Sequence, residues 1–239
     1  MKIVRRFPYS SYSFALSSSS ISEAWIDFAS SLRRLENVII VKKLDDDALR
    51  LFQKLVTGRK LSSLMMLAEV CGSMEVIKTL LCQDQFKNLP IWNNFEDWNG
   101  AAVGELLQFW SENSEELRGK SLILGNNCKG GVEQLEQFVL RRASPTATED
   151  LGKVLKVCST EECNFINRVF HHDNITYVKS PYVYKYEDAR EGNARSLYVS
   201  FKCPTQEERR NMPRFPAGYD GYDDLSVMRY TTCLQIFFC

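Results

Sequence analysis

The residues best suited to acid–base chemistry are the only two histidines of the chain, His171 and His172. They follow Cys158 and Cys163, so a zinc site with two cysteines and two histidines is one interpretation. Adjacent side chains on an extended chain point to opposite faces, however, so both histidines are poorly placed to hold one ion. We therefore expect a solvated loop here, with no metal, no cofactor and no catalytic residue in the chain.

A glycine-rich segment at residues 125–131 (GNNCKGG) lies where a strand should pass into a helix. Backbone amides at such a place can hold a phosphate. The segment fits neither of the two common phosphate-binding glycine motifs, so it predicts a tight turn with Lys129 exposed. The alternative is a small α/β enzyme that binds a phosphorylated or nucleotide ligand at this loop, through Asn127, Lys129 and backbone amides.

Three residues are candidates for recognition or modification. Trp92 and Trp98 fall at a strand end and in the loop after it, where a large aromatic side chain suits a protein-binding surface as well as a core-capping role. Ser144 follows Arg141 and Arg142 and precedes a proline, which is the form of a kinase acceptor site. A phosphate on Ser144 would pair with these two arginines.

The composition excludes several classes of protein. Lysine and arginine (30) balance aspartate and glutamate (30), which argues against general nucleic-acid binding. No apolar run is long enough for a membrane span, and the basic start of the chain lacks the apolar stretch of a signal peptide. The eight cysteines favour reduced structural thiols, so we expect a cytoplasmic or nuclear protein.

A strand–helix order recurs along the first half of the chain and must position these residues. The four predicted strands lie at 35–41, 61–67, 86–92 and 122–124, and the helices after them at 48–55, 74–81, 101–110 and 132–140. The anchor leucines and valine (Val38, Leu64, Leu89, Leu122) are 26, 25 and 33 residues apart. Such a unit has the length of a leucine-rich repeat, and Asn94 and Asn127 occupy its turn position. An ordinary α/β sheet with right-handed crossovers is the alternative.

The chain is expected to have four parts. Residues 1–20 are serine-rich and predict a disordered leader, and residues 21–142 form the α/β domain that resembles leucine-rich repeats. Residues 143–150 read as a linker, and residues 151–239 as a smaller β-rich lobe that contains a hairpin.

Two segments carry a family resemblance: residues 98–117, a loop and a helix that ends in a tryptophan, and the charged hairpin at 183–197. They resemble the F-box-associated domains expanded in nematodes. That resemblance implies an irregular repeat domain that recruits substrates to a ubiquitin ligase. Residues 1–60 show no F-box pattern, so what the resemblance implies for this chain is the binding domain.

The sequence thus favours a non-enzymatic protein-interaction module over the small α/β enzyme. Stacked strand–helix units share one core and leave a broad strand face for a partner. The expected partners are an unidentified protein target and ubiquitin-ligase components, with no nucleic acid and no membrane.

Overall fold

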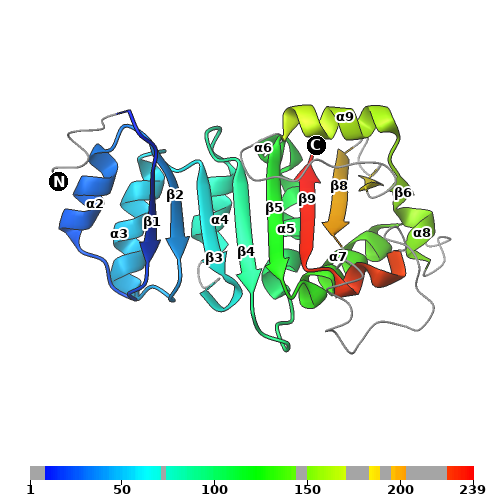
Figure 1. Ribbon diagram of the computed structural model, residues 1–239, viewed down its shortest axis with the longest axis horizontal. Helices are drawn as coiled ribbons and strands as arrows, with labels where there is room; N and C mark the ends of the chain where they lie inside the picture. The colour runs from blue at the N-terminus through cyan, green and yellow to red at the C-terminus, as the bar shows by residue number, and fades with distance from the viewer. Residues whose placement is uncertain (1–8, 71–73, 144–149, 171–182, 189–194, 203–224) are drawn as a thin grey trace. The chain divides into compact units, whose positions relative to one another are not determined.

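The computed structural model describes residues 9–70, 74–143, 150–170, 183–188, 195–202 and 225–239. The chain divides into two compact units, residues 1–92 and 93–239, which we describe separately. Both are mixed α and β, and strands alternate with helices as the sequence predicts (Figure 1). The α/β class is therefore confirmed, whereas nothing in the fold distinguishes a leucine-rich repeat from an ordinary α/β sheet.

Unit 1 is a parallel sheet with helices on one face. Its elements are β1 (Tyr12–Leu16), α2 (Glu23–Ser31), β2 (Leu35–Ile40), α3 (Asp46–Thr57), β3 (Ser63–Leu67), the 3-10 turn η1 (Ala68–Val70), α4 (Met74–Leu81) and β4 (Asn88–Asn93). Strand β1 pairs with β2, β2 with β3 and β3 with β4, all parallel. The register aligns Asn37 with Ser63 and Ser63 with Asn88.

Helix α3, predicted at 48–55, runs from Asp46 to Thr57 and is two residues longer at each end. Asp45 caps the helix by accepting a hydrogen bond from the Ala48 amide at 2.7 Å, and Asp46 and Asp47 fill the first turn, where the helix dipole favours negative charge. Gly58, which follows the last helical residue, is right-handed, and Arg59 adopts the left-handed φ of 53°. The turn thus closes one residue later, with the Arg59 amide bonded to the Val56 carbonyl.

The expectation that residues 1–20 are a disordered leader is wrong for Tyr12–Leu16, which form strand β1. Phe14 supplies the reason, because its ring packs edge-on against Trp25 and Phe28 of α2 at 6.1 and 6.0 Å. The Tyr12 amide also donates to the Arg34 carbonyl, which joins β1 to the start of β2. Aromatic packing and a ladder partner order a serine-rich stretch that composition alone assigns to disorder.

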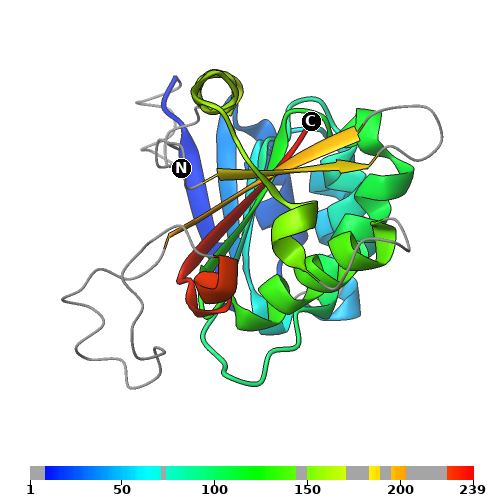
Figure 2. The same ribbon diagram turned by 90° about the vertical axis from the view of Figure 1, so that its right-hand side faces the viewer.

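Unit 2 is an antiparallel sheet with helices on both faces. Its elements are α5 (Ala101–Glu112), α6 (Ser114–Leu117), β5 (Lys120–Asn126), α7 (Lys129–Arg142), α8 (Leu151–Val154), β6 (Lys156–Val157), α9 (Thr160–Val169), β7 (Val183–Asp188), β8 (Arg195–Lys202), η3 (Leu225–Tyr230) and β9 (Cys233–Phe238). The strand order is β5-β9-β8-β7-β6. Figure 2 shows α5 and α7 on one side of these strands and α9 on the other.

Each face of the unit 2 sheet has its own core. On the α5 and α7 side, Trp110 is fully buried and lies against Phe138 and Phe238. On the α9 side, Phe170 packs on Phe237 with ring centroids 4.8 Å apart. A sheet covered on both faces leaves little strand surface for a partner.

The structure places the division of the chain elsewhere than the expected linker at 143–150. The C-terminal strand β9 lies between β5 and β8, so residues before and after that segment share one sheet. Two ion pairs add to this link: Arg142 binds the buried Asp188 at 2.9 Å, and Arg229 binds the buried Glu136. Residues 151–239 are therefore not a separate lobe from residues 93–142.

Candidate functional site

The strand face of unit 1 that the helices leave uncovered is the candidate site, and we call it the open face. Successive side chains of a strand point to opposite sides, so each strand gives alternate residues to this face. Its members come from all four strands: Ser13 and Ala15 of β1; Asn37 and Ile39 of β2, with Val41 directly after that strand; Ser63, Met65 and Leu67 of β3; and Asn88, Pro90 and Trp92 of β4. The other parity, which includes Val38, Leu64 and Leu89, is fully buried against the helices.

The open face is layered from the amino ends of its strands to their carboxyl ends. The parallel register aligns Ser13, Asn37, Ser63 and Asn88 into a polar row. The rows further along are apolar and consist of Ala15, Ile39, Met65 and Pro90, followed by Val41, Leu67 and Trp92. The sequence therefore builds a surface with one polar border and an apolar middle.

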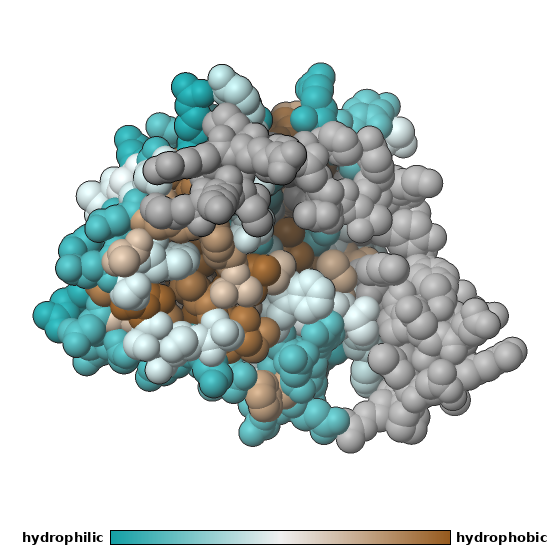
Figure 3. Space-filling model, turned by 60° about the vertical axis from the view of Figure 1, so that its left-hand side comes forward, coloured by the Kyte–Doolittle hydropathy of each residue, from teal (hydrophilic) through white to brown (hydrophobic). Residues whose placement is uncertain are grey.

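The apolar rows are accessible to solvent. Trp92 is 41% exposed and Val41 36% exposed, while Ile39, Met65 and Leu67 are half-buried. Figure 3, which looks obliquely at this side of the molecule, shows apolar side chains gathered in the middle and bordered by polar ones. Large contiguous apolar patches on a protein surface mark interaction sites.

The structure separates the two tryptophans that the sequence singles out. Trp92 lies on the open face beside Leu67, its partner in the register. Trp98 is half-buried in the loop before α5, and its ring lies next to Gly131 of α7. Trp92 is thus exposed on the open face, whereas Trp98 packs within unit 2.

An asparagine cluster holds the loop between β4 and α5 in unit 2. The buried Asn93 accepts a hydrogen bond from the Phe95 amide and donates to the carbonyls of Phe95 and Asn127, at 2.9–3.0 Å. Asn127 donates to the Phe95 carbonyl and accepts from the Lys129 amide. The repeat pattern assigned the turn position to Asn94, but Asn94 is exposed and bonds only Asn126 in this cluster.

The glycine-rich segment at 125–131 is occupied by protein packing. A side chain at Gly130 would overlap the Trp98 carbonyl, and one at Gly131 would overlap Leu124. Both the nitrogen and the oxygen of the Asn127 side-chain amide are already hydrogen-bonded in the asparagine cluster. Gly130 is therefore required by the close approach of α7 to the 98–100 segment, and Gly131 by the close approach of α7 to Leu124 of β5.

A pocket of about 470 Å³, which we call the hollow, lies between α5 and α7 in unit 2. It is lined mainly by polar residues that include Glu105, Gln108 and Arg141, and neither Asn127 nor Lys129 is among them. Arg142 also lines it, although its guanidinium is held by Asp188 and lies over the Phe138 ring. The hollow is not at the place where the enzyme alternative requires a ligand site.

The cysteines that the structure describes are free thiols. Burial raises the pKa of Cys128, Cys158 and Cys239 to about 12, so these thiols stay protonated and are poor nucleophiles. No group of three potential metal ligands occurs among the described residues. His171, His172 and Ser144 lie outside those residues.

One charged cluster in unit 2 involves a strand lysine. Lys185 of β7 binds Glu187 at 2.7 Å and Glu162 at 3.3 Å, and it lies over the Tyr198 ring. The hydrogen bond that the Lys185 ammonium donates to Glu187 raises the pKa of Lys185 and lowers that of Glu187. The lysine and the two glutamates neutralise one another, so these ion pairs account for the charged groups of the cluster without a ligand.

Comparisons with known proteins add no family to this description. No family model matches the chain, and no curated protein and no solved structure matches it. In the described part of the chain, every helix is too short or too polar to cross a membrane.

The residues that sequence analysis missed are those of the apolar rows: Ile39, Met65, Leu67 and Pro90. The runs that contain them were recognised as strands but not divided into two faces. Buried and half-buried positions alternate along these strands in the structure, but residues 38–41 and 64–67 are apolar at every position, so the sequence holds no polar–apolar alternation that separates the two faces.

Proposed function

We propose that this protein is a non-enzymatic protein-interaction module whose open face binds a partner protein. One observation carries the proposal: the apolar rows around Met65 and Trp92 are exposed on a sheet whose other face is fully packed. Exposed aromatic and aliphatic side chains on a rigid sheet lose little conformational freedom on binding, which favours affinity.

The resemblance to nematode F-box-associated domains suggests which kind of partner this module binds. Such a module would recognise a substrate for a ubiquitin ligase in the cytoplasm or nucleus. What supports this is the segment at 98–117 and the hairpin that ends at 197, together with the broad open face. Ligase components are accordingly the second class of expected partner.

Affinity capture from native cells tests the proposal with three baits. The first is the wild type, the second the Met65→Glu/Trp92→Glu variant of the open face, and the third is Phe165→Glu. Phe165 of α9 is 37% exposed, a fraction similar to the 41% of Trp92. It belongs to unit 2 and is therefore a matched control.

We expect a set of proteins, scored for ubiquitin-ligase adaptor subunits, that the wild type and Phe165→Glu capture and the open-face variant does not. A charge placed in an apolar contact must be desolvated without a partner, so the loss should exceed tenfold, or about 1.4 kcal/mol. Identical sets for all three baits would show that the open face is not the binding surface.

The enzyme alternative has less support. The glycines of residues 125–131 serve helix packing, and the hollow in unit 2 lies away from Lys129. A thermal-shift panel of nucleotides still tests it: a stabilisation that Lys129→Ala abolishes would favour the enzyme.

A further inference from the structure

Strand β1 forms the outer edge of the sheet in unit 1, since among the described residues only β2 pairs with it. Successive residues of a strand turn their backbone N–H and C=O groups to alternate sides. The Tyr12 amide and the Leu16 carbonyl bond to the residues on either side of β2. Ser13 and Ala15 therefore direct their backbone groups to the free side. The register shift at Tyr12 comes from an extra residue of β2, Glu36, so β1 itself is regular.

The free edge of β1 lacks the features that usually protect an edge strand. Proteins guard such edges with charged side chains, prolines or very short strands. The five residues of β1, Tyr-Ser-Phe-Ala-Leu, contain no charge and no proline. Strand β6, which ends the sheet in unit 2, has only two residues, and one of them is Lys156, bound to Glu187 at 3.5 Å. An unguarded edge such as that of β1 is a template for a further strand.

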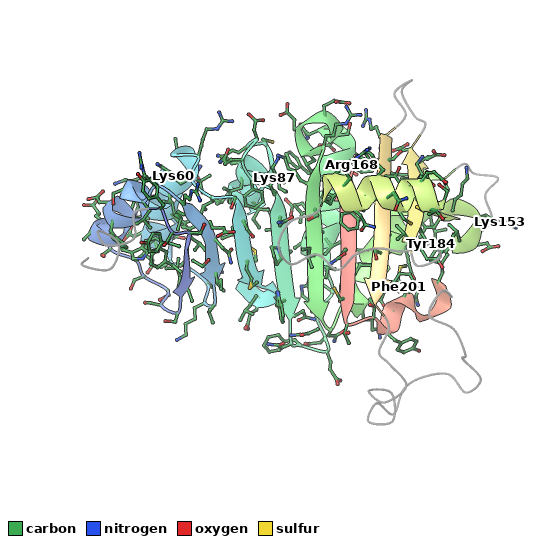
Figure 4. The ribbon with its side chains drawn as sticks, turned by 45° about the horizontal axis from the view of Figure 1, so that its top comes forward. Lys60, Lys87, Lys153, Arg168, Tyr184 and Phe201 are labelled. Atoms are coloured by element: carbon green, nitrogen blue, oxygen red, sulfur yellow. The ribbon has the colours of Figure 1, made fainter. Side chains whose placement is uncertain are left out.

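Helix α2 extends past this edge on the covered side of the sheet. Figures 1 and 4 both show α2, blue at the left, farther from β2 than β1 is. Trp25 and Phe28 of α2 contact the ring of Phe14, yet all three side chains are only half-buried. We call these three residues the aromatic shelf. Their uncovered surface is apolar area that side chains beyond β1 can bury.

We infer that the free edge of β1 binds an extended segment of another protein as an additional strand. The backbone of that segment pairs with Ser13 and Ala15, and every second side chain lies on the aromatic shelf. A row of backbone donors and acceptors matches an extended chain but not a helix, whose backbone groups are already paired. The site is separate from the open face, so the inference does not rest on what binds there.

The neighbouring side chains define the chemistry of the segment. A charged side chain on the aromatic shelf would lose its hydration and gain no partner of opposite charge from β1. The segment is therefore apolar at the positions that face the shelf. Its other side chains lie beside Ser13 and Ala15, which are both exposed, and polar residues suit those positions.

The position of α2 argues against a second copy of this chain as the occupant. Side chains that lie opposite one another in paired strands are on the same side of the sheet. A copy that paired through its own β1 would therefore place its α2 on the same side as the first α2. Both helices extend past their edges, so they would compete for the same space. A single extended segment brings no helix with it.

Fluorescence anisotropy with a designed peptide tests the inference on the full-length protein. The peptide has about nine residues, within the usual length of a strand, with valine alternating with threonine and a lysine at each end for solubility. Two further versions carry N-methyl groups on alternate amides, either those of the valines or those of the threonines. Only one of these two sets of amides faces β1. We expect the parent peptide to bind, one methylated version to bind about as well, and the other to bind about tenfold more weakly or worse.

A substitution in β1 locates the binding. Ala15→Pro removes the amide that points to the free side, and an edge strand tolerates proline where its N–H group faces solvent. We expect the affinity of the parent peptide to fall about tenfold or more. Ala15→Thr keeps the amide and is the matched control, with an expected change of less than about twofold. Thermal unfolding shows whether each variant is folded, and the methylated peptides test the pairing on the wild type if Ala15→Pro is not.

Three outcomes would overturn the inference. The first is that the parent peptide does not bind, or that both methylated versions bind as well as the parent. The second is that the protein alone dimerises in sedimentation velocity and Ala15→Pro abolishes the dimer, since the edge then binds a second copy. The third is that Met65→Glu/Trp92→Glu abolishes peptide binding and Ala15→Pro does not, which would place the peptide on the open face and support the proposed function instead.

Discussion

Both units are built from strands and helices, but their sheets differ in how many faces the helices cover. Unit 1 buries one face of its parallel strands and leaves the other, with Met65 and Trp92, to solvent. Unit 2 covers one face with α5 and α7 and the other with α9, so that Trp110 and Phe237 are both fully buried. The proposed recognition surface therefore lies in unit 1, and unit 2 is the part in which substitutions should cost most stability.

Removal of the buried carboxylate of Asp188 should give the largest loss. Asp188→Ala leaves the Arg142 guanidinium without its acidic partner, and breaking a buried ion pair costs about 3–5 kcal/mol. Urea unfolding measures this. Glu23→Ala removes the exposed pair with Lys54 in unit 1 and should cost less than about 1 kcal/mol. Equal costs for both variants would contradict the contrast between the units.

The asparagine cluster should give the next largest effect. Asn93→Ala removes three hydrogen bonds and leaves the carbonyls of Phe95 and Asn127 with one partner fewer, which should cost about 2 kcal/mol. Thermal unfolding measures the loss, and hydrogen exchange should report faster exchange of the Phe95 amide. Asn94→Ala, in the exposed neighbour, should change stability by less than about 0.5 kcal/mol. A larger effect at Asn94 than at Asn93 would indicate that Asn94 occupies the turn position of the repeat, as the sequence pattern predicts.

Alkaline pH should destabilise unit 2 through its buried thiols. Burial raises the pKa of Cys128, Cys158 and Cys239 from 9.0 to about 12, so the folded state keeps protons that the unfolded state releases. Their contribution is therefore complete below pH 9 and is lost as the pH rises from 9 to about 12. Urea midpoints over that range measure the loss, and Cys128→Ser should alter their slope. A midpoint that does not change over this range would be inconsistent with these pKa values.

Thiol labelling sharpens the same contrast at constant pH. At pH 8 the half-buried Cys82 of unit 1 should react with iodoacetamide well before Cys128, whose thiolate is scarce. Peptide mapping by mass spectrometry resolves the two sites. Faster labelling of Cys128 would indicate that α7 and β5 separate readily.

A truncation on the open face should cost less stability than one in the core of unit 2. Trp92→Ala should lower the free energy of unfolding by about 1–2 kcal/mol, because much of the side chain is solvated in the folded protein. Trp110→Ala, in the core of unit 2, should cost about 3–5 kcal/mol. Urea unfolding of both variants tests the pair, and a cost at Trp92 close to that at Trp110 would mean that Trp92 is a core residue.

Much of the fold was predictable because its signals are local. The helices after each apolar run and the antiparallel pair of β7 and β8 follow from neighbouring residues, and both predictions are confirmed. The candidate site was predictable only in part. Trp92 was identified from its place at a strand end, but Ile39 and Met65 were not, because a strand pattern alone does not tell which face a helix will cover.

The amino-acid sequence by itself determined most of the helices and strands after residue 20, since periodicity and capping depend on residues only a few positions apart. Only the tertiary structure decided that Tyr12–Leu16 joins the sheet of unit 1 and that β9 lies between β5 and β8. Those pairings depend on contacts between residues far apart in the chain, which leave no local trace. The same long-range packing left one face of unit 1 uncovered and buried both faces of unit 2.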